Sequence, residues 1–288
     1  YTLMNGIKVV FSILVLLSVT VLGMPAWADD GPKHQKANKN FGVSGGNVND
    51  ISKRYCCSGT LGSLVVGNVT QYILSNNHVL ARGDQAAPGE KISQPGLIDN
   101  WCQVPPIVAY FTTAPKLGSN VDAAIAELIS GAMNAQGTIQ DIGSISTSVR
   151  SPAINLQVAK SGRTTGFTTG SISSINTDVK VQYQKGCGTG KKFTVSYRNQ
   201  ILISSSTFSA GGDSGSLIVS NDSTCRQPVG LLFAGSSTTT IANPIGEVLI
   251  KVGFALGSSV SFAKINMKVM KRTTVATAIT ELRYTATA

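Results

Sequence analysis

Short apolar segments rich in valine, isoleucine, leucine and threonine recur between clusters of glycine, asparagine, serine and aspartate across residues 59–262. Runs of this length, bounded by turn-forming residues, are typical of β-strands. The segments of this character are 61–66, 71–75, 107–111, 123–128, 155–159, 170–175, 192–197, 216–220 and 229–234. So many short strands predict an all-β domain built as a sandwich or barrel. One helix is expected after Pro244, with one apolar face formed by Ile245, Val248, Leu249 and Val252.

Composition limits the class of protein further. The chain has 288 residues, of which 42% are hydrophobic and 13% charged, so it can bury a sizeable core and is not a disordered chain. Its net charge is +10, but the basic residues form no dense run beyond a short cluster at 268–272. A nucleic-acid partner is therefore not expected. The polar residues 29–54 predict a flexible lead-in, and the basic, threonine-rich residues 263–288 predict a tail.

The N-terminal residues have the pattern of an export signal. Lys8 precedes an apolar run over residues 9–23, and Pro25 closes this run. The sequence Ala26, Trp27, Ala28 then supplies small residues at the positions that a signal peptidase reads. We expect residues 1–28 to be a signal peptide cleaved after Ala28, which leads to a secreted, periplasmic or cell-envelope protein. An uncleaved membrane anchor is the alternative.

Five cysteines are present, Cys56, Cys57, Cys102, Cys187 and Cys225. No pair has the Cys-x-x-Cys spacing, and the predicted domain holds one histidine, so a zinc site is not expected. In an exported chain, the plain interpretation is two disulfides and one odd thiol. Cys187 with Cys225 is the first candidate pair, and Cys102 with Cys56 or Cys57 is the second. The spacing alone does not determine this connectivity.

Three segments carry residues suited to acyl-transfer chemistry. His78 stands at the predicted exit of a strand, and His34, the other histidine, lies in the lead-in. A single histidine is more often structural or solvated, but His78 is the only reasonable general base in the predicted domain. Asp122 opens an apolar segment, where a carboxylate needs a partner. It could face water at a strand edge, or accept the imidazole N–H of His78.

The third segment is the glycine-flanked serine, Ser214, directly before an apolar strand. Small neighbours let a carbonyl substrate approach the hydroxyl and let backbone N–H groups point at a developing oxyanion. Gly212 and Ser214 are the candidates for these two N–H donors. By itself, such a string could also be a polar turn.

In the order His78, Asp122, Ser214, these segments resemble the chymotrypsin/trypsin family of serine peptidases. The sequence Asn-His-Val-Leu-Ala stands at its histidine motif, Val-Asp-Ala-Ala-Ile at its aspartate motif, and Gly-Asp-Ser-Gly-Ser at its nucleophile motif. Residues 229–235 look like the strand that carries the substrate backbone, and residues 158–166 look especially like the secreted bacterial branch. The resemblance spans roughly residues 59–249.

The resemblance implies two packed antiparallel six-stranded β-barrels over residues 55–262, dividing near residues 137–148, with a short C-terminal helix. It implies that Ser214 is the nucleophile, His78 the base and Asp122 the residue that orients His78, with the N–H groups of Gly212 and Ser214 as the oxyanion hole. The expected protein is a monomeric exported serine endopeptidase that hydrolyses protein or peptide substrates through an acyl-enzyme, without a metal or cofactor.

The sequence departs from the family pattern around Asp213. No Ile-Val-Gly-Gly segment is present to supply the new N-terminus that pairs with this aspartate in animal trypsins. A buried Asp213 without a partner would be costly. Arg163 stands where the bacterial branch has an arginine, so an Asp213–Arg163 ion pair is predicted, with a surface role for Arg163 as the alternative. No cysteine follows His78, so the disulfide that often clamps that loop is absent.

Specificity is indicated by the residue six positions before the nucleophile, where trypsin-like members have an aspartate and this chain has Phe208. A pocket for small or apolar side chains is therefore predicted, lined by Phe208, Phe233, Ala234 and Gly235. The alternative is that Phe208 packs in the barrel core.

Two other functions compete with the peptidase. A catalytically silent trypsin-like barrel could act as a binding module, but silent members usually lose one of the three residues that are all present here. A serine esterase of another fold commonly has Gly-x-Ser-x-Gly before a helix and the order Ser, Asp, His. Here the residues around Ser214 do not fit that five-residue pattern, and the chain order is His78, Asp122, Ser214.

Overall fold

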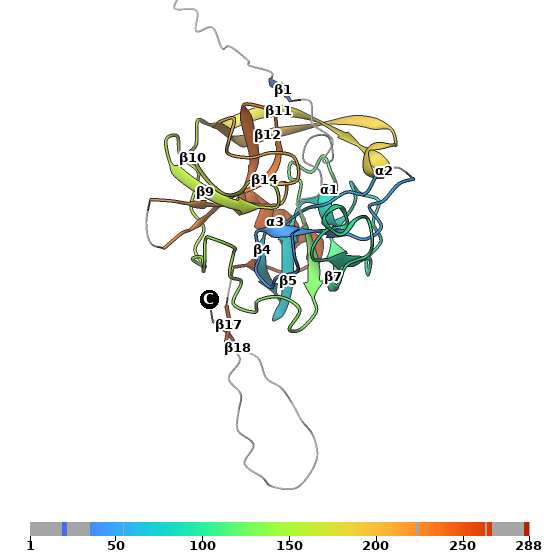
Figure 1. Cartoon of the computed structure of the whole chain (residues 1–288). Helices are drawn as coiled ribbons and strands as arrows, with labels where there is room; N and C mark the ends of the chain where they lie inside the picture. The colour runs from blue at the N-terminus through green and yellow to red at the C-terminus, as the bar shows by residue number, and fades with distance from the viewer. Residues whose placement is uncertain are drawn as a thin grey trace, which may run out of the picture.

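Two curled antiparallel β-sheets pack against each other in the computed structural model, which describes residues 19–21, 35–53, 55–222, 225–262, 264–266 and 285–287 (Figure 1). The first sheet has the spatial order β16 (Val260–Ser261), β4 (Ser63–Gly67), β5 (Thr70–Ser75), β8 (Ala124–Leu128), β7 (Ile107–Thr113), β6 (Lys91–Ser93), β2 (Val43–Asn47) and β3 (Gly59–Leu61). The second has the order β1 (Val19–Val21), β11 (Ser174–Gln184), β12 (Lys192–Ser204), β15 (Thr239–Pro244), β14 (Pro228–Gly235), β13 (Leu217–Ser220), β9 (Gln157–Gly162) and β10 (Gly166–Ser171).

The predicted all-β architecture of two antiparallel bodies is confirmed. Each sheet contains eight strands rather than six, because short segments extend the edges. In the first sheet β16 pairs with β4, and in the second β1 pairs with β11 in parallel. A further small pair, β17 (Lys264–Asn266) and β18 (Thr285–Thr287), lies outside both sheets.

Apolar side chains from the two sheets form a shared core. Ile73, Leu74 and Ile125 of the first sheet are fully buried and belong to the same cluster as Leu217 and Leu231 of the second. A second cluster lies within the second sheet alone. The two sheets therefore pack through apolar surface. Residues from both sheets line one cleft.

Most predicted strands are present, but the segment 170–175 is wrong as a single strand. There β10 ends at Ser171 and β11 begins at Ser174. Strand β11 was not among the predicted segments, although its sequence carries the alternation of a half-buried strand: Ile175, Val179, Val181 and Tyr183 stand at every second or fourth position, with polar residues between them. Because polar residues interrupt it at every second position, it has no continuous apolar run like those that marked the other strands.

The expected C-terminal helix is confirmed as α3 (Ile245–Leu256). Ile245, Val248 and Val252 are buried against the shared core, as their helical spacing predicts. The helix ends at Gly257, whose φ of 76° is the left-handed conformation that glycine adopts readily. The shorter helices are α1 (Asn77–Leu80), α2 (Lys185–Gly188) and the 3-10 helix η1 (Leu97–Asn100).

None of the described helices is long and apolar enough to cross a membrane. The predicted signal peptide, residues 1–28, lies outside the described residues except for β1. The same is true of residues 29–34 of the predicted lead-in, and of the predicted tail beyond residue 262 except for β17 and β18. The prediction of a flexible lead-in over residues 29–54 is wrong for its later part, because Phe41 is fully buried in the shared core and β2 is a buried strand of the first sheet.

Candidate active site

His78 and Asp122 come together because their supporting strands are neighbours. His78 lies in α1, just after β5, and Asp122 lies just before β8. Since β5 and β8 pair with Ser75 opposite Ala124, the end of one strand meets the start of the other. His78 Nδ1 lies 2.6 Å from Asp122 Oδ2, and the backbone N–H of His78 donates to Asp122 Oδ1 at 3.1 Å. The carboxylate therefore holds both the ring and the backbone of His78.

The carboxylate of Asp122 is fully buried and accepts a third hydrogen bond that sequence reasoning did not foresee. Tyr183 of β11 donates its hydroxyl to Asp122 Oδ2 at 2.8 Å, and the Tyr183 and Tyr197 hydroxyls lie 2.7 Å apart. The backbone N–H of Asp122 donates to Asn243 Oδ1 at 2.9 Å. No motif marks Tyr183; the signal that places it on the inner face of a strand is the alternation of Val179, Val181 and Tyr183 with polar residues.

Burial and neighbouring carboxylates shift the pKa values of the ionisable side chains in the site. Burial opposes a charged imidazole, but the charge and hydrogen bond of Asp122, together with the charge of Asp50, outweigh it and raise the pKa of His78 above 6.5. Asp50 lines the same cavity, and burial raises its pKa to about 6. Burial, then the charge of Asp122, raises the pKa of Tyr183 well above 10.0, so its hydroxyl stays protonated.

Ser214 lies in a loop whose shape depends on two glycines. Gly212 and Gly215 have φ values of 93° and 96°, a region that side chains with a Cβ rarely adopt. The loop is held from the first sheet by Thr60, whose N–H donates to Ser214 O at 2.8 Å and whose hydroxyl donates to Gly212 O at 3.0 Å. Within the described residues, no hydrogen bond uses the backbone N–H of Gly212 or Ser214. Both donors are thus available to a bound oxygen.

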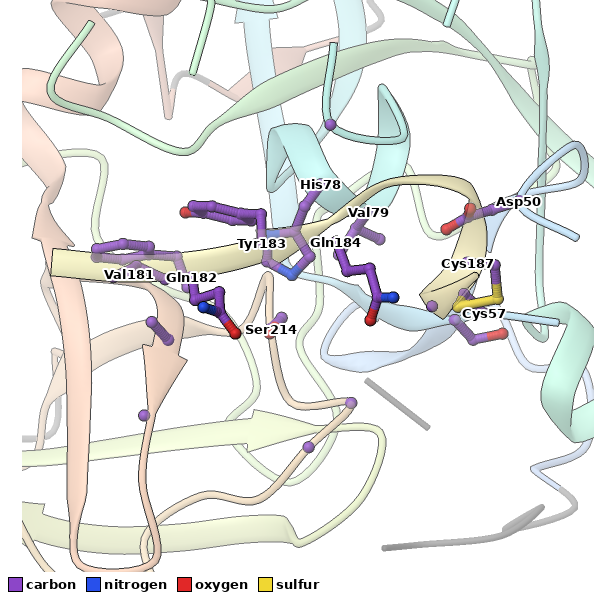
Figure 2. A pocket seen from close by; sticks show the side chains of 18 of the residues that line it. Asp50, Cys57, His78, Val79, Val181, Gln182, Tyr183, Gln184, Cys187 and Ser214 are labelled. Carbon is purple, nitrogen blue, oxygen red and sulfur yellow. A yellow bond between two sulfur atoms is a disulfide. The ribbon is translucent and has the colours of Figure 1, made fainter. Parts of the chain in front are cut away.

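His78 and Ser214 line one cavity of about 400 Å³ between the two sheets. Figure 2 shows both side chains facing this space, with Tyr183 beside His78. No hydrogen bond joins Ser214 Oγ to His78 in the part of the chain that the structure describes. Such contacts are often long before substrate binds and tighten in the complex.

The predicted Asp213–Arg163 ion pair is wrong. Asp213 Oδ2 lies 3.3 Å from Lys160 Nζ, and Arg163 pairs instead with Asp99, through Nε to Oδ2 at 2.8 Å and Nη2 to Oδ1 at 3.1 Å. Lys160 lies within β9, whereas Arg163 follows the end of that strand at Gly162, so the two side chains meet different carboxylates. The buried charge still has an internal cation, because Lys160 is fully buried beside Asp213.

The Asp213 carboxylate also organises the chain around the nucleophile. Backbone N–H groups of Thr164, Thr165 and Ala210 donate to it at 2.8, 3.2 and 3.0 Å, and the Thr165 hydroxyl donates at 2.7 Å. Burial lowers the pKa of Lys160, and the charge of Asp213 opposes that effect. The pair therefore ties β9 to the loop that carries Ser214.

Three of the four predicted pocket residues line the cavity, namely Phe233, Ala234 and Gly235. Phe208 does not: it is fully buried in the core of the second sheet. Its neighbour Ser209 lines the cavity instead, and its hydroxyl lies 2.5 Å from that of Thr240. Phe208 therefore packs in the barrel core, which was the alternative, and does not contribute to the specificity of the pocket.

The first candidate disulfide, Cys187–Cys225, is also wrong. Cys57 bonds to Cys187, while Cys56 bonds to Cys102, one of the two second-choice pairs. Cys225 is exposed and takes part in neither bond. The Cys57–Cys187 bond links the chain just before β3 to α2 at the tip of the β11–β12 hairpin, and both cysteines line the cavity.

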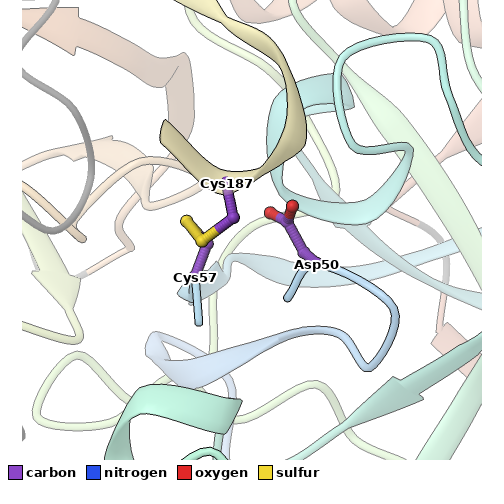
Figure 3. Close-up of side chains that lie close together, drawn as sticks. All are labelled: Asp50, Cys57 and Cys187. Atoms are coloured by element: carbon purple, nitrogen blue, oxygen red, sulfur yellow. A yellow bond between two sulfur atoms is a disulfide. The ribbon is translucent and has the colours of Figure 1, made fainter. Parts of the chain in front are cut away.

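One group of potential metal ligands exists among the described residues. The ligand atoms of Asp50, Cys57 and Cys187 lie within 4.8 Å of one another (Figure 3). Because the two sulfurs are bonded to each other, neither is a thiolate, and a zinc ion would find only the Asp50 carboxylate there.

Comparison with known proteins finds structural rather than sequence similarity. No family model matches the chain, and no curated protein matches it. Among solved structures, a glutamic acid specific serine protease that uses a histidine triad in substrate binding has 17% identity and a TM-score of 0.50, with 77% of this chain and 98% of that chain covered. Thermobifida fusca protease A has 18% identity and a TM-score of 0.49, with 78% and 98% covered. Cellulomonas bogoriensis chymotrypsin has 18% identity and a TM-score of 0.47, with 77% and 97% covered. The two curled antiparallel sheets and the match over nearly the whole of the first protease show that this chain has the chymotrypsin-like fold.

Proposed function

We propose that the protein is an exported serine endopeptidase that cleaves peptide bonds with Ser214, His78 and Asp122. The observation that carries this proposal is the contact between His78 Nδ1 and Asp122 Oδ2, at 2.6 Å, on the wall of the cavity that Ser214 also lines. The solved structures of similar fold are serine proteases, which supports a peptide as the substrate.

The proposed reaction begins when Ser214 Oγ attacks the carbonyl carbon of a peptide bond and gives its proton to His78 Nε2. The backbone N–H groups of Gly212 and Ser214 stabilise the negative charge that develops on the carbonyl oxygen. As the carbon–nitrogen bond breaks, protonated His78 gives its proton to the leaving amine, and an ester on Ser214 remains. Water, deprotonated by His78, then hydrolyses this ester. Asp122 keeps Nδ1 protonated and stabilises the imidazolium.

A silent binding barrel is the competing function. Two features favour the enzyme: the two backbone N–H donors beside Ser214 are not used within the described residues, and the Asp122 carboxylate is buried against the imidazole. A binding module has no need to hold a buried carboxylate against a histidine at the mouth of a cavity.

A fluorophosphonate probe tests the proposal directly. Folded protein beginning at Asp29 is treated with the probe, and the modified residue is located by mass spectrometry of peptides. The expected result is an adduct on Ser214 and none on Ser209, which lines the same cavity but whose hydroxyl is hydrogen-bonded with that of Thr240. The absence of any adduct on folded protein would favour the silent barrel.

Activity is expected to rise with pH through the raised pKa of His78, since only the neutral imidazole accepts the proton of Ser214. Replacing Asp50 by asparagine removes one of the charges that raise this pKa, so the acidic limb of the profile should move to lower pH. The measurement is the rate of fluorophosphonate inactivation between pH 5 and 9. The exposed Asp141→Asn variant is the control and should follow the wild type, while an unmoved limb in Asp50→Asn would contradict the assignment.

Cleavage after lysine or arginine is expected to be disfavoured. Asp50 is the one carboxylate among the described residues of the cavity wall, and it lies beside the Cys57–Cys187 disulfide (Figure 2). A histidine triad for glutamate is excluded as well, since the chain has only two histidines. Peptide-library profiling should therefore show small or apolar residues before the cleaved bond. Ser209→Asp should introduce cleavage after lysine and arginine, and a wild-type preference for these residues would refute the prediction.

Export is part of the proposal. The Cys56–Cys102 and Cys57–Cys187 disulfides favour an oxidising compartment. Export followed by cleavage after Ala28 would give a mature chain with Asp29 at its N-terminus, which N-terminal sequencing of the secreted protein would detect.

A further inference from the structure

The hydroxyl groups of Tyr183 and Tyr197 form a directed chain that ends on Asp122. The ionised carboxylate of Asp122 can only accept, so Tyr183 donates its single proton to Oδ2 at 2.8 Å. The 2.7 Å contact between the two tyrosines then needs Tyr197 as donor. Oδ2 is also the atom that faces His78 Nδ1. Tyr183 thus acts on the same carboxylate oxygen that orients the histidine.

Tyr183 reaches this position from the other sheet. His78 and Asp122 are attached to β5 and β8 of the first sheet, whereas Tyr183 lies near the end of β11 in the second. Its ring stacks on Phe193 of β12 at a centroid distance of 5.6 Å, and it lies 5.9 Å from the His78 ring. The His78–Asp122 pair is therefore completed only when the β11–β12 hairpin lies against the first sheet.

A covalent bond holds the hairpin there. Cys187 follows Tyr183 closely, in α2 at the hairpin tip, and its bond to Cys57 ties that tip to the chain just before β3 (Figures 2 and 3). Much of the hairpin is exposed, with only Val179, Val181 and Tyr197 buried among its aromatic and β-branched residues near this end. These buried residues pack on Phe233 and Ile241, which belong to the second sheet. The disulfide is thus the covalent link that ties the tip of the hairpin to the chain of the first sheet.

We propose that Tyr183 is a positioning residue for the His78–Asp122 pair and that the Cys57–Cys187 disulfide keeps it in place, so that opening this one disulfide disables the site. The predicted loss of activity rests on the proposed peptidase function. The predicted change in the pKa of His78 does not, because it can be measured on the resting protein without turnover.

The test uses Tyr183→Phe, which keeps the ring and removes the hydroxyl. Without that donor, more negative charge remains on Asp122 Oδ2, so the pKa of His78 should rise by about half a unit. Histidine ring protons followed by NMR against pH report this value, and a His34→Gln variant assigns the His78 signal. The groups that face His78 and must be kept unchanged are Asp122 and Asp50, with Arg82 acting on Asp50. The fluorophosphonate inactivation rate should fall about tenfold.

The disulfide arm uses the double variant Cys57→Ser/Cys187→Ser, with Cys56→Ser/Cys102→Ser as the matched control. The first should raise the pKa of His78 and slow inactivation as Tyr183→Phe does, and the control should do neither. When Tyr183→Phe is already present, removing Cys57–Cys187 should add little, because both changes act through one hydroxyl.

Two results would overturn the inference. One is an unchanged His78 pKa and inactivation rate in Tyr183→Phe, which decides the matter even if the cysteine variants do not fold. The other is a disulfide effect that persists in full in the Tyr183→Phe background. If the wild type takes no fluorophosphonate, the peptidase function fails, while the NMR shift still decides whether Tyr183 positions His78.

Discussion

Replacing Ser214 by alanine is expected to abolish fluorophosphonate labelling and to lower kcat for peptide hydrolysis by about 10⁴- to 10⁶-fold. Without Oγ the covalent intermediate cannot form, and only binding and the two backbone N–H donors are left to assist attack by water. The fold should be retained, because no hydrogen bond among the described residues uses the Ser214 hydroxyl. The measurement is kcat on the best peptide from the library, with the circular dichroism spectrum as the test of folding.

Ser216→Ala is the matched control for this change. Ser216 lies in the same loop, but its buried hydroxyl donates to Asp213 O at 2.7 Å and does not line the cavity. Labelling should therefore persist in Ser216→Ala. If Ser214→Ala kept a tenth or more of the wild-type rate, another nucleophile would have to be sought in the cavity.

Replacing Lys160 by methionine is expected to destabilise the protein by about 3–5 kcal/mol. The substitution leaves the Asp213 carboxylate in the interior without its cation, although the backbone donors around it remain. Both side chains are fully buried, so water cannot replace the lost partner. Urea unfolding followed by fluorescence measures the free energy of unfolding. The exposed Lys180→Met variant is the control and should change stability by about 0.5 kcal/mol or less.

Double-mutant cycles separate the observed pairing from the one expected on sequence grounds. Lys160 and Asp213 should show a coupling energy of about 0.5–3 kcal/mol, as should Arg163 and Asp99. Arg163 with Asp213 should show clearly less. A strong Arg163–Asp213 coupling together with a weak Lys160–Asp213 coupling would mean that the charges pair differently in solution.

The all-β class was predictable because buried strands need apolar residues, and the segments around Ile73, Ile125 and Leu231 have them. The helix after Pro244 was predictable for the same reason, since its buried residues follow the helical period. Strand β11 was missed because polar residues fill every second position along it, which leaves no continuous apolar run like those of the other segments. The candidate site therefore lacked Tyr183, which this strand supplies.

Local sequence also identified the three candidate catalytic residues, which stand beside glycines or at strand ends. His78, Asp122 and Ser214 could be singled out because each stands in a short segment whose neighbours suit its proposed chemistry. Their geometry could not be obtained in that way, since the contact between His78 and Asp122 depends on the pairing of β5 with β8.

The sequence by itself determined most of the sheet-forming segments, the helix and the candidate reactive side chains, because these depend on residues close together in the chain. Only the tertiary structure decided the partners of buried charges and cysteines. Lys160 and Arg163 are near neighbours in sequence, yet they pair with different carboxylates, and Cys187 bonds to Cys57 across the cavity. Such choices depend on which side chains meet after the sheets have packed, and on the cost of leaving a charge buried without a partner.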